Sequence, residues 1–427
     1  MSSVCVHGLG YIGLPTAAML ANYGHEVYGY DVDEEITTTL RNGDVHLDEP
    51  GLRAFVTQAL ESEQLEIIDE VVPAKYHIIC VPTPFDEETK AADLSYVREA
   101  GRELAPLLRE GDTVILESTV PPGTSVDELR PILETSGLVA GDDFALGHCP
   151  ETVMPGNIIT ELRENNRILG GVNGVSTESA ARLYESFVNG TIHTTSDPTV
   201  AEFVKLIQNT YRDVNIALAN EIARLAADYG IDSRESIALA NEHPRVDILQ
   251  PGPGVGGHCL PVDPWFLGAN SDALEVVATA RRVNDGMTGF ILDLLREELD
   301  GMDETKIAVL GVAYKGNVSD TRMSPGLKLS RELAQSEAVT VVTDGGAPDC
   351  EVAIHDPHVT DPTLDLSDLD TATSDADAIV LTTDHDEYEA LDPSSLRERM
   401  AGNVVIDTKG VLDAGKWRDA GFTVRRI

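Results

Sequence analysis

Basic residues are scarce in this chain of 427 residues. There are 31 lysines and arginines against 73 aspartates and glutamates, which gives a formal net charge of −42 at pH 7. A surface this negative repels phosphates, so we exclude nucleic acid as a partner. The acidic residues are spread along the whole chain, and 42% of all residues are hydrophobic. This combination excludes a disordered chain and favours a halophilic protein, folded in concentrated salt.

Cysteine is also rare, and no C-x-x-C pair occurs. The thiols are Cys5, Cys80, Cys149, Cys259 and Cys350. An odd number without paired spacing argues against a disulfide framework and against structural zinc, so we predict no metal. The same usage favours a reducing compartment, and we expect the protein in the cytoplasm.

Long hydrophobic runs are missing as well. None approaches the roughly 18 residues that a membrane-spanning helix needs, so no membrane partner is predicted. The N-terminus passes directly into a strand-like segment, which does not resemble a secretory signal.

The first 33 residues carry the clearest pattern. The apolar segment "VCVHG" runs into Gly8-x-Gly10-x-x-Gly13, a helical stretch follows to Asn22, and a second strand, "EVYGYDVD", contains Asp31. Glycines between a strand and a helix let a pyrophosphate approach the backbone, and an acid about 20 residues on binds ribose hydroxyls. We predict an NAD site, because an acid at this position disfavours the 2′-phosphate of NADP.

The rest of the chain predicts a second α/β unit after a helical region. Strand-like segments occur at 76–84, 113–123 and 144–151, and again at 306–315, 338–343, 351–359, 377–388, 403–410 and 422–427. Helical spacing over 197–229 stops at Gly230, and a further helical stretch covers 273–299. We therefore predict two Rossmann-like, doubly wound domains, 1–196 and 301–427. A long helix within a central dimerisation domain, 197–300, joins them. The pair His355-x-x-His358, at a strand end, is interpreted as structural.

Seven motifs resemble one family. They are "GLGYIGLPTA", "VPTP", "ESTVPPGT", "CPE", "VKLIQNTYRDVNIALANE", "GGHCLPVDP" and "GVAYKGNVSDTRMSP", in this order along essentially the full chain. Together they resemble the UDP-glucose/GDP-mannose dehydrogenase family. This resemblance implies oxidation of the C6 hydroxymethyl of a nucleotide sugar to a carboxylate, with two NAD and a cysteine nucleophile. It also implies that the N-terminal domain holds NAD and the C-terminal domain holds the UDP-sugar.

The resemblance assigns the chemistry to a few side chains. Cys259, in a glycine-rich loop, is the implied nucleophile; a thiolate can trap the aldehyde intermediate and pass through a thioester. Lys205 is the implied base for the C6 hydroxyl, and Asn209, one helical turn later, is directed at the same oxygen. Asp263 is implied to work with the lysine through a water. Glu151 and Thr119 match residues that activate water for hydrolysis, although both could serve only to position NAD.

Binding residues follow from the same comparison. NAD contacts are implied for Gly8, Gly10, Tyr11, Ile12, Gly13, Asp31, Thr83, Thr119 and Lys409. Substrate contacts are implied for Glu151, Lys205, Asn209, Arg245, Gly256, His258, Tyr314 and Lys315. Arg322 lies in a shared segment, and Arg245 resembles an arginine that reaches the sugar of a neighbouring subunit, which implies a homodimer.

The residues around Cys259 narrow the choice of sugar substrate. Relatives that act on UDP-glucose or GDP-mannose usually carry serine and lysine where this chain has His258 and Val262, so the loop resembles the branch acting on UDP-N-acetylhexosamines. UDP-N-acetylmannosamine is the predicted substrate, with UDP-N-acetylglucosamine and UDP-glucose as alternatives. Thr152 stands where that branch usually has arginine, which leaves substrate contacts there open. A non-catalytic NAD-binding scaffold is the alternative of a different class, although a scaffold would not need Cys259 or Lys205.

The charge leads to a prediction about stability. Salt at about 1 M screens charge repulsion beyond roughly 3 Å. We therefore expect the melting temperature to rise by roughly 5 °C or more, equivalent to about 2 kcal/mol for units of this size, between dilute buffer and molar potassium chloride. Differential scanning calorimetry measures the change. An unchanged melting temperature would contradict the adaptation to salt.

Overall fold

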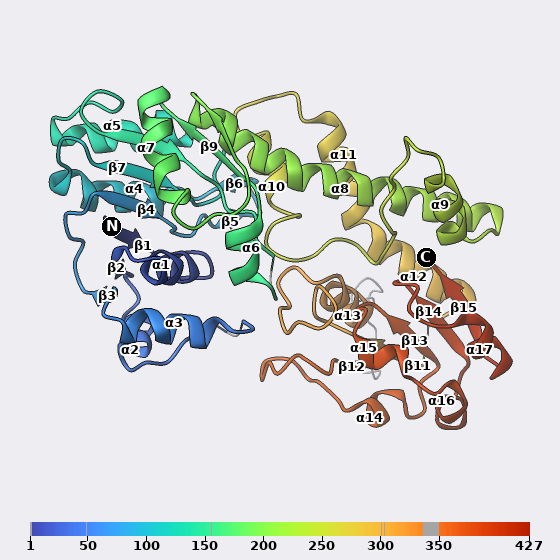
Figure 1. The fold of residues 1–427 in the computed structure, drawn as a ribbon. Helices are drawn as coiled ribbons and strands as arrows, with labels where there is room; N and C mark the ends of the chain where they lie inside the picture. Colours follow the sequence, from blue (N-terminus) through green and yellow to red (C-terminus); the bar gives the residue numbers. More distant parts are fainter. Residues whose placement is uncertain (1, 48, 155, 300, 303, 336–349) are drawn as a thin grey trace, which may run out of the picture. The chain divides into compact units, whose positions relative to one another are not determined.

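The computed structural model describes residues 2–427 except 48, 155, 300, 303 and 336–349. The chain forms two compact units (Figure 1). The first contains Met1–Gln208 and Trp265–Asp272, and the second contains Asn209–Pro264 and Ala273–Ile427. Both α8 (Pro198–Tyr229) and the short α10 (Asp263–Leu267) cross a boundary between the units.

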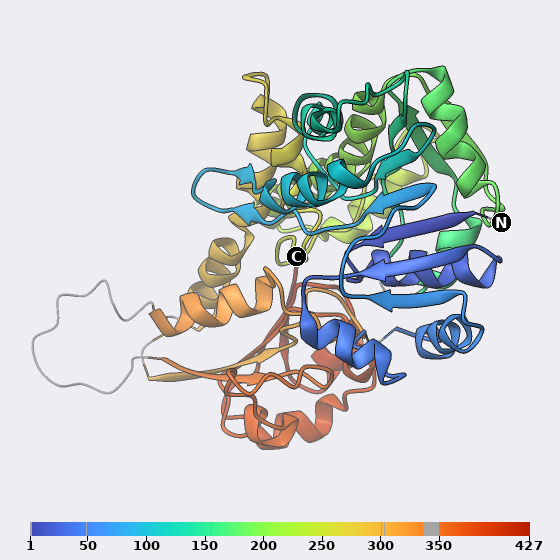
Figure 2. The ribbon, with the colours of Figure 1, turned by 90° about the vertical axis from the view of Figure 1, so that its left-hand side faces the viewer.

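The first unit is built on an eight-stranded sheet with the order β10-β9-β8-β7-β4-β1-β2-β3 among the described residues. Its strands are β1 (Ser3–His7), β2 (Glu26–Tyr30), β3 (Leu65–Ile68), β4 (Tyr76–Ile79), β7 (Thr113–Leu116), β8 (Ala145–His148), β9 (Arg167–Gly171) and β10 (Ile192–Thr195). All neighbouring strands are parallel except β8 and β9. The connections leave β1 in both directions, which is the doubly wound arrangement. A small hairpin, β5 (Phe85–Asp86) with β6 (Ala91–Ala92), projects away from this sheet in Figure 2.

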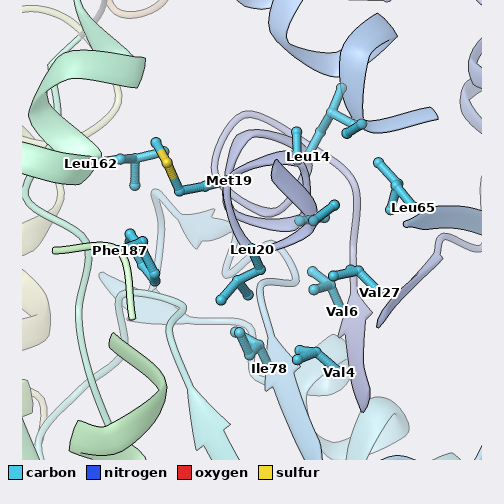
Figure 3. Packing of buried hydrophobic residues seen from close by; sticks show 14 of the residues in the cluster. Val4, Val6, Leu14, Met19, Leu20, Val27, Leu65, Ile78, Leu162 and Phe187 are labelled. Atoms are coloured by element: carbon cyan, nitrogen blue, oxygen red, sulfur yellow. The ribbon is translucent and has the colours of Figure 1, made fainter. Parts of the chain in front are cut away.

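Helices cover both faces of this sheet because neighbouring strand residues point to opposite sides. Ile115 belongs to one hydrophobic cluster, and its neighbour Val114 belongs to another. The helices are α1 (Gly13–Asn22), α2 (Glu34–Arg41), α3 (Leu52–Glu61), α4 (Ser95–Leu104), α5 (Arg130–Leu133), α6 (Ile158–Glu164) and α7 (Gly174–Tyr184). In Figure 3, Leu20 of α1 lies over Val6 and Ile78 of the strands, and all three are fully buried.

The second unit is built on a parallel five-stranded sheet with the order β12-β11-β13-β14-β15 among the described residues. Its strands are β11 (Thr305–Leu310), β12 (Cys350–His355), β13 (Ala378–Leu381), β14 (Val404–Asp407) and β15 (Thr423–Arg426). Its helices, besides the second part of α8, are α9 (Ser233–Asn241), α11 (Glu275–Asp285), α12 (Met287–Glu298), α13 (Pro325–Gln335), α14 (Leu369–Thr373), α15 (Asp386–Glu389), α16 (Pro393–Arg399) and α17 (Ala414–Asp419). Ligands of such sheets bind at the carboxyl ends of the strands, where the strand order reverses.

The predicted α/β class with two Rossmann-like sheets is confirmed, and α8 ends directly before Gly230, as its pattern indicated. The helical stretch predicted over 273–299 is two helices, α11 and α12, which meet at Gly286. The strand predicted at 338–343 lies outside the described residues. Strands β3, β9 and β10 and the hairpin were not predicted. The division into 1–196, 197–300 and 301–427 stays a prediction.

Within the described parts of the chain, no helix is both long enough and apolar enough to cross a bilayer.

Candidate active site

The glycine-rich turn after β1 has the shape that a dinucleotide needs. A Cβ at position 13 would lie 1.8 Å from the carbonyl oxygen of Gly8, so only glycine lets α1 pack this closely on β1. A Cβ at Gly10 would meet nothing within 4 Å, which leaves that backbone open to a ligand. A close helix contact beside an open backbone position fits a pyrophosphate at the start of α1.

Asp31 is tied to this turn. Its Oδ2 accepts a hydrogen bond from the backbone N–H of Leu9 at 2.6 Å, and its Oδ1 accepts one from Asp33 at 2.9 Å. The carboxylate therefore stands beside the glycine turn, where a ribose would follow a bound pyrophosphate. Tyr11 and Ile12 pack against the hydrophobic cluster that contains Ile115. The Tyr11 hydroxyl donates a hydrogen bond to Glu49, a contact that the sequence did not indicate.

Thr83 and Thr119 are brought together from loops 36 residues apart. The Thr83 hydroxyl donates to the carbonyl oxygen of Thr119 at 2.7 Å. The loops follow β4 and β7, which are neighbouring parallel strands and therefore end at one edge of the sheet. Both predicted residues thus lie on the same edge as the glycine turn after β1.

Lys205 and Glu151 form a largely buried ion pair in the first unit. Lys205 Nζ lies 3.0 Å from Glu151 Oε1, and the two side chains are only 8% and 12% exposed. The second oxygen, Glu151 Oε2, accepts the backbone N–H of Val153 at 2.6 Å. Removing one partner of a buried pair costs about 3–5 kcal/mol, because the other charge is left uncompensated. This pair fixes the loop after β8 on α8.

The loop that carries Cys259 belongs to the second unit, and Cys259 is exposed. The carbonyl oxygen of Cys259 accepts backbone N–H groups from Val262 at 3.0 Å and Asp263 at 2.8 Å. Asp263 is 3% exposed, and its Oδ2 accepts Asn209 Nδ2 at 2.6 Å. The predicted residues Asn209 and Asp263 are therefore in contact, and the turn that begins at Cys259 ends at Asp263. Val262 is also buried, at 2% exposed, so its side chain packs inside the protein.

A pair of glycines connects the Cys259 loop with the loop after β11. A Cβ on Gly257, which has φ +85, would lie 2.9 Å from the ring of Tyr314, and one on Gly256 would lie 2.9 Å from the Tyr314 Cβ. The N–H of Gly257 donates to the carbonyl oxygen of Arg322 at 2.9 Å. Arg322 in turn forms an ion pair with Asp320 at 2.5 Å. The ring of Tyr314 thus lies directly against the backbone next to the nucleophile predicted at Cys259.

The remaining predicted site residues do not form comparable contacts with one another. Arg245, His258 and Lys315 have exposed side chains in the second unit. Lys409, after β14, is half-buried and lies 3.2 Å from Asp384 Oδ1. Their predicted roles rest on the resemblance alone.

Asp356 and His385, which the sequence reading did not single out, hold the start of the loop that carries Tyr314. Asp356 Oδ2 accepts the N–H groups of Val312 at 2.7 Å and Ala313 at 2.9 Å, and His385 Nε2 lies 3.1 Å from the same oxygen. Burial alone would raise the pKa of Asp356, but the hydrogen bonds from His385, Ala313 and Val312 lower it to about 2. A lowered folded-state pKa means that this group stabilises the fold above its ordinary pKa of about 3.9 and loses that contribution as the pH falls towards 2.

Two groups of described side chains have the composition of metal ligands. They are Cys5, His7 and His77 in the first unit, and His358, His385 and Glu387 in the second. His7 Nε2 and His77 Nδ1 lie 3.3 Å from each other, and His385 Nδ1 accepts the N–H of Asn317. Burial raises the pKa of the Cys5 thiol to about 12, which opposes the thiolate that a metal requires. The absence of a metal stays a prediction.

The contact between Gly257 and Tyr314 can be tested. We expect Gly257→Ala to lower turnover roughly 100-fold, because the new methyl group and the positive φ would displace the Cys259 backbone. Steady-state kinetics measures the effect. The control is Gly289→Ala, where a Cβ would meet nothing within 4 Å. Equal activity of both variants would show that the contact is dispensable.

Comparison with known proteins identifies the parts. Three domains of the UDP-glucose/GDP-mannose dehydrogenase family match this chain: the NAD binding domain at residues 2–188, the central domain at 199–286 and the UDP binding domain at 308–414. A "UDP-N-acetyl-D-mannosamine dehydrogenase" from Methanococcus maripaludis is 41% identical over 100% of this chain and 97% of the relative. An "NDP-N-acetyl-D-galactosaminuronic acid dehydrogenase" from Ralstonia nicotianae is 40% identical over 96% of both chains.

The fold agrees with a solved relative. The structure of the UDP-D-ManNAc dehydrogenase from Pyrococcus horikoshii matches with a TM-score of 0.90 and 41% identity, covering 100% of this chain and 99% of that chain. Sequence and fold agree over the whole length, and the matched domains include the glycine turn with Asp31 and the loop with Tyr314. The chain therefore belongs to the UDP-glucose/GDP-mannose dehydrogenase family.

Proposed function

We propose that this chain oxidises the C6 hydroxymethyl group of UDP-N-acetylmannosamine to a carboxylate and reduces two NAD per sugar. The main support is the packing of Gly257 on Tyr314, because it brings the Cys259 loop into contact with a loop inside the matched UDP binding domain. The names of the Methanococcus and Pyrococcus relatives favour the N-acetylmannosamine sugar.

NAD is the cofactor of this family, and the first unit fits it. The open backbone at Gly10, the close contact at Gly13 and the acceptor Asp31 would hold its pyrophosphate and ribose. Bound there, NAD would supply the hydride acceptor for the two oxidation steps. The threonines Thr83 and Thr119, joined by their hydrogen bond, would flank the site at the same edge of the sheet.

The first oxidation requires removal of a proton from the C6 hydroxyl. Lys205 serves as the base, with Asp263 acting through a water molecule, and Asn209 hydrogen-bonds to the developing alkoxide. The contacts of Lys205 with Glu151 and of Asn209 with Asp263 hold both side chains in one orientation, and Lys205 can accept the hydroxyl proton once its ammonium group has lost a proton to Glu151. Loss of the hydroxyl proton and of a hydride gives the aldehyde.

Cys259 carries the second oxidation. Its sulfur adds to the aldehyde carbon, which gives a thiohemiacetal, and loss of a hydride and a proton from this adduct leaves a thioester. Water then attacks the thioester carbonyl, the C–S bond breaks, and the thiol and the carboxylate are released. Glu151 and Thr119 activate and orient this water. The exposed position of Cys259 on a glycine-rich turn supports its role as nucleophile.

Tyr314 and Lys315 bind the nucleotide, and Arg245 reaches the sugar bound by a partner subunit. A homodimer is supported by exposed apolar residues on α8 in the second unit, at Tyr211, Leu218 and Leu225. Their spacing of seven residues places them on one face of the helix, as in helix-to-helix interfaces. We place the enzyme in the cytoplasm, in keeping with its cysteine usage.

The substrate proposal is tested by comparing UDP-sugars in molar potassium chloride. We expect kcat/KM for UDP-N-acetylmannosamine to exceed that for UDP-N-acetylglucosamine and UDP-glucose by roughly 10- to 200-fold. At completion, two NADH should form per sugar. Preference for UDP-glucose would overturn the N-acetyl class, preference for UDP-N-acetylglucosamine would overturn the epimer, and one NADH per sugar would overturn the mechanism.

The nucleophile is tested separately. Cys259→Ser should lower formation of the uronic acid by roughly 10⁴-fold or more, because a serine alkoxide forms less readily and its ester is cleaved more slowly. NAD affinity should not change. The control Cys350→Ser, in β12, should keep wild-type turnover. Production of uronic acid by Cys259→Ser at the wild-type rate would refute the assignment of Cys259 as the nucleophile.

A further inference from the structure

Two buried side chains on the first turns of α8 contact two different loops of the first unit. Glu202 is 1% exposed and Lys205 is 7% exposed. They are three residues apart, which places them on neighbouring positions of one helix face. Lys205 binds Glu151 in the loop after β8, whereas Glu202 binds the loop after β7. One helix segment therefore supports both loops to which we assign water activation.

The contact of Glu202 is made with backbone. Its Oε2 accepts the N–H of Gly123 at 2.6 Å, and its Oε1 accepts the N–H of Ser125 at 2.8 Å. The preceding Pro121 and Pro122 have no N–H to donate, so Gly123 is the first residue after them that can attach the loop by its amide. The two carboxylate oxygens thus hold the far end of this loop.

The near end of the same loop is held by Thr83. The Thr83 hydroxyl donates to the carbonyl oxygen of Thr119, and the Ser118 hydroxyl donates to the carbonyl oxygen of Val81 at 2.7 Å. Thr119 therefore lies between two attachment points, one made by the loop after β4 and one made by Glu202. No strand or helix includes residues 117–123, so these contacts contribute to the position of Thr119.

Burying a carboxylate in this position costs free energy, so we expect the Glu202 carboxylate to have a specific role. Burial raises the pKa of Glu202 to about 7, although the hydrogen bonds from Ser125 and Gly123 act in the opposite direction. A neutral glutamine would be easier to bury. Glutamine has one acceptor oxygen, however, and its NH₂ group would face the second backbone N–H. Only a carboxylate can accept both N–H groups at this reach.

We propose that Glu202 is a positioning residue for the hydrolytic half of the reaction. It fixes the Thr119 loop on the same helix segment that fixes Glu151, so that both residues act on one water molecule. This inference rests on the proposed function, because it uses the thioester step assigned to Cys259, Thr119 and Glu151.

The test separates oxidation from hydrolysis in Glu202→Gln. On mixing with UDP-N-acetylmannosamine and NAD, this variant should form two NADH per active site in a rapid first phase. Its later steady rate should be roughly 100-fold below that of the wild type, the effect expected of a displacement of about 1 Å. Mass spectrometry of acid-quenched enzyme should then detect the sugar acyl group on Cys259.

Two variants keep the result interpretable. Glu178→Gln, at an exposed position of α7 in the first unit, should behave as the wild type. Glu202→Asp keeps both acceptor oxygens, so its steady rate should lie between those of the wild type and Glu202→Gln; this variant also serves if Glu202→Gln does not fold. A rate for Glu202→Asp below that of Glu202→Gln would overturn the proposal.

The remaining outcomes are distinct from one another. Wild-type turnover in Glu202→Gln, or loss of its rapid NADH phase with normal folding, would overturn the positioning role. If the wild-type enzyme itself forms a single NADH per sugar, the proposed function fails, whatever Glu202 does.

Discussion

Parallel pairing of strands is the constraint on which the rest of this structure depends. Parallel strands end at the same edge of a sheet, so loops that are distant in sequence come together there. In the first unit this brings Asp31 to the turn after β1 and Thr83 to Thr119. In the second unit it brings Asp356 and His385 to the loop after β11. Each unit therefore carries several of its candidate binding residues on loops at one edge of its sheet.

Loops at such an edge have no regular backbone hydrogen bonds of the kind that join strands. Buried polar contacts hold these loops in position instead. Lys205 with Glu151, Glu202 with two backbone amides, and Asp356 with two others each combine a buried charge with hydrogen bonds. A buried charge is tolerated only when it is paired or hydrogen-bonded, so these contacts allow few alternative loop positions.

Much of the fold followed from local patterns. The helix after Gly13, the long α8 and several strands of both sheets were predicted, because glycine spacing and hydrophobic periodicity act within a few residues. The break between α11 and α12 was missed, since Gly286 within a helical pattern is often tolerated. The antiparallel β9 was missed because direction within a sheet depends on neighbours far along the chain. Asp356, His385 and Glu202 were missed because their partners are largely backbone amides in distant loops, which leave no motif.

The sequence by itself determined the α/β class, the NAD turn and the family, because these depend on residue order and on local spacing. It also named Lys205, Glu151, Asn209 and Asp263, through resemblance. Only the tertiary structure decided which of them touch: Lys205 meets Glu151, and Asn209 meets Asp263, each across 54 residues of chain. Such pairs form only after strands and helices have packed, because the packed sheet supplies both the position and the low exposure that make each contact strong.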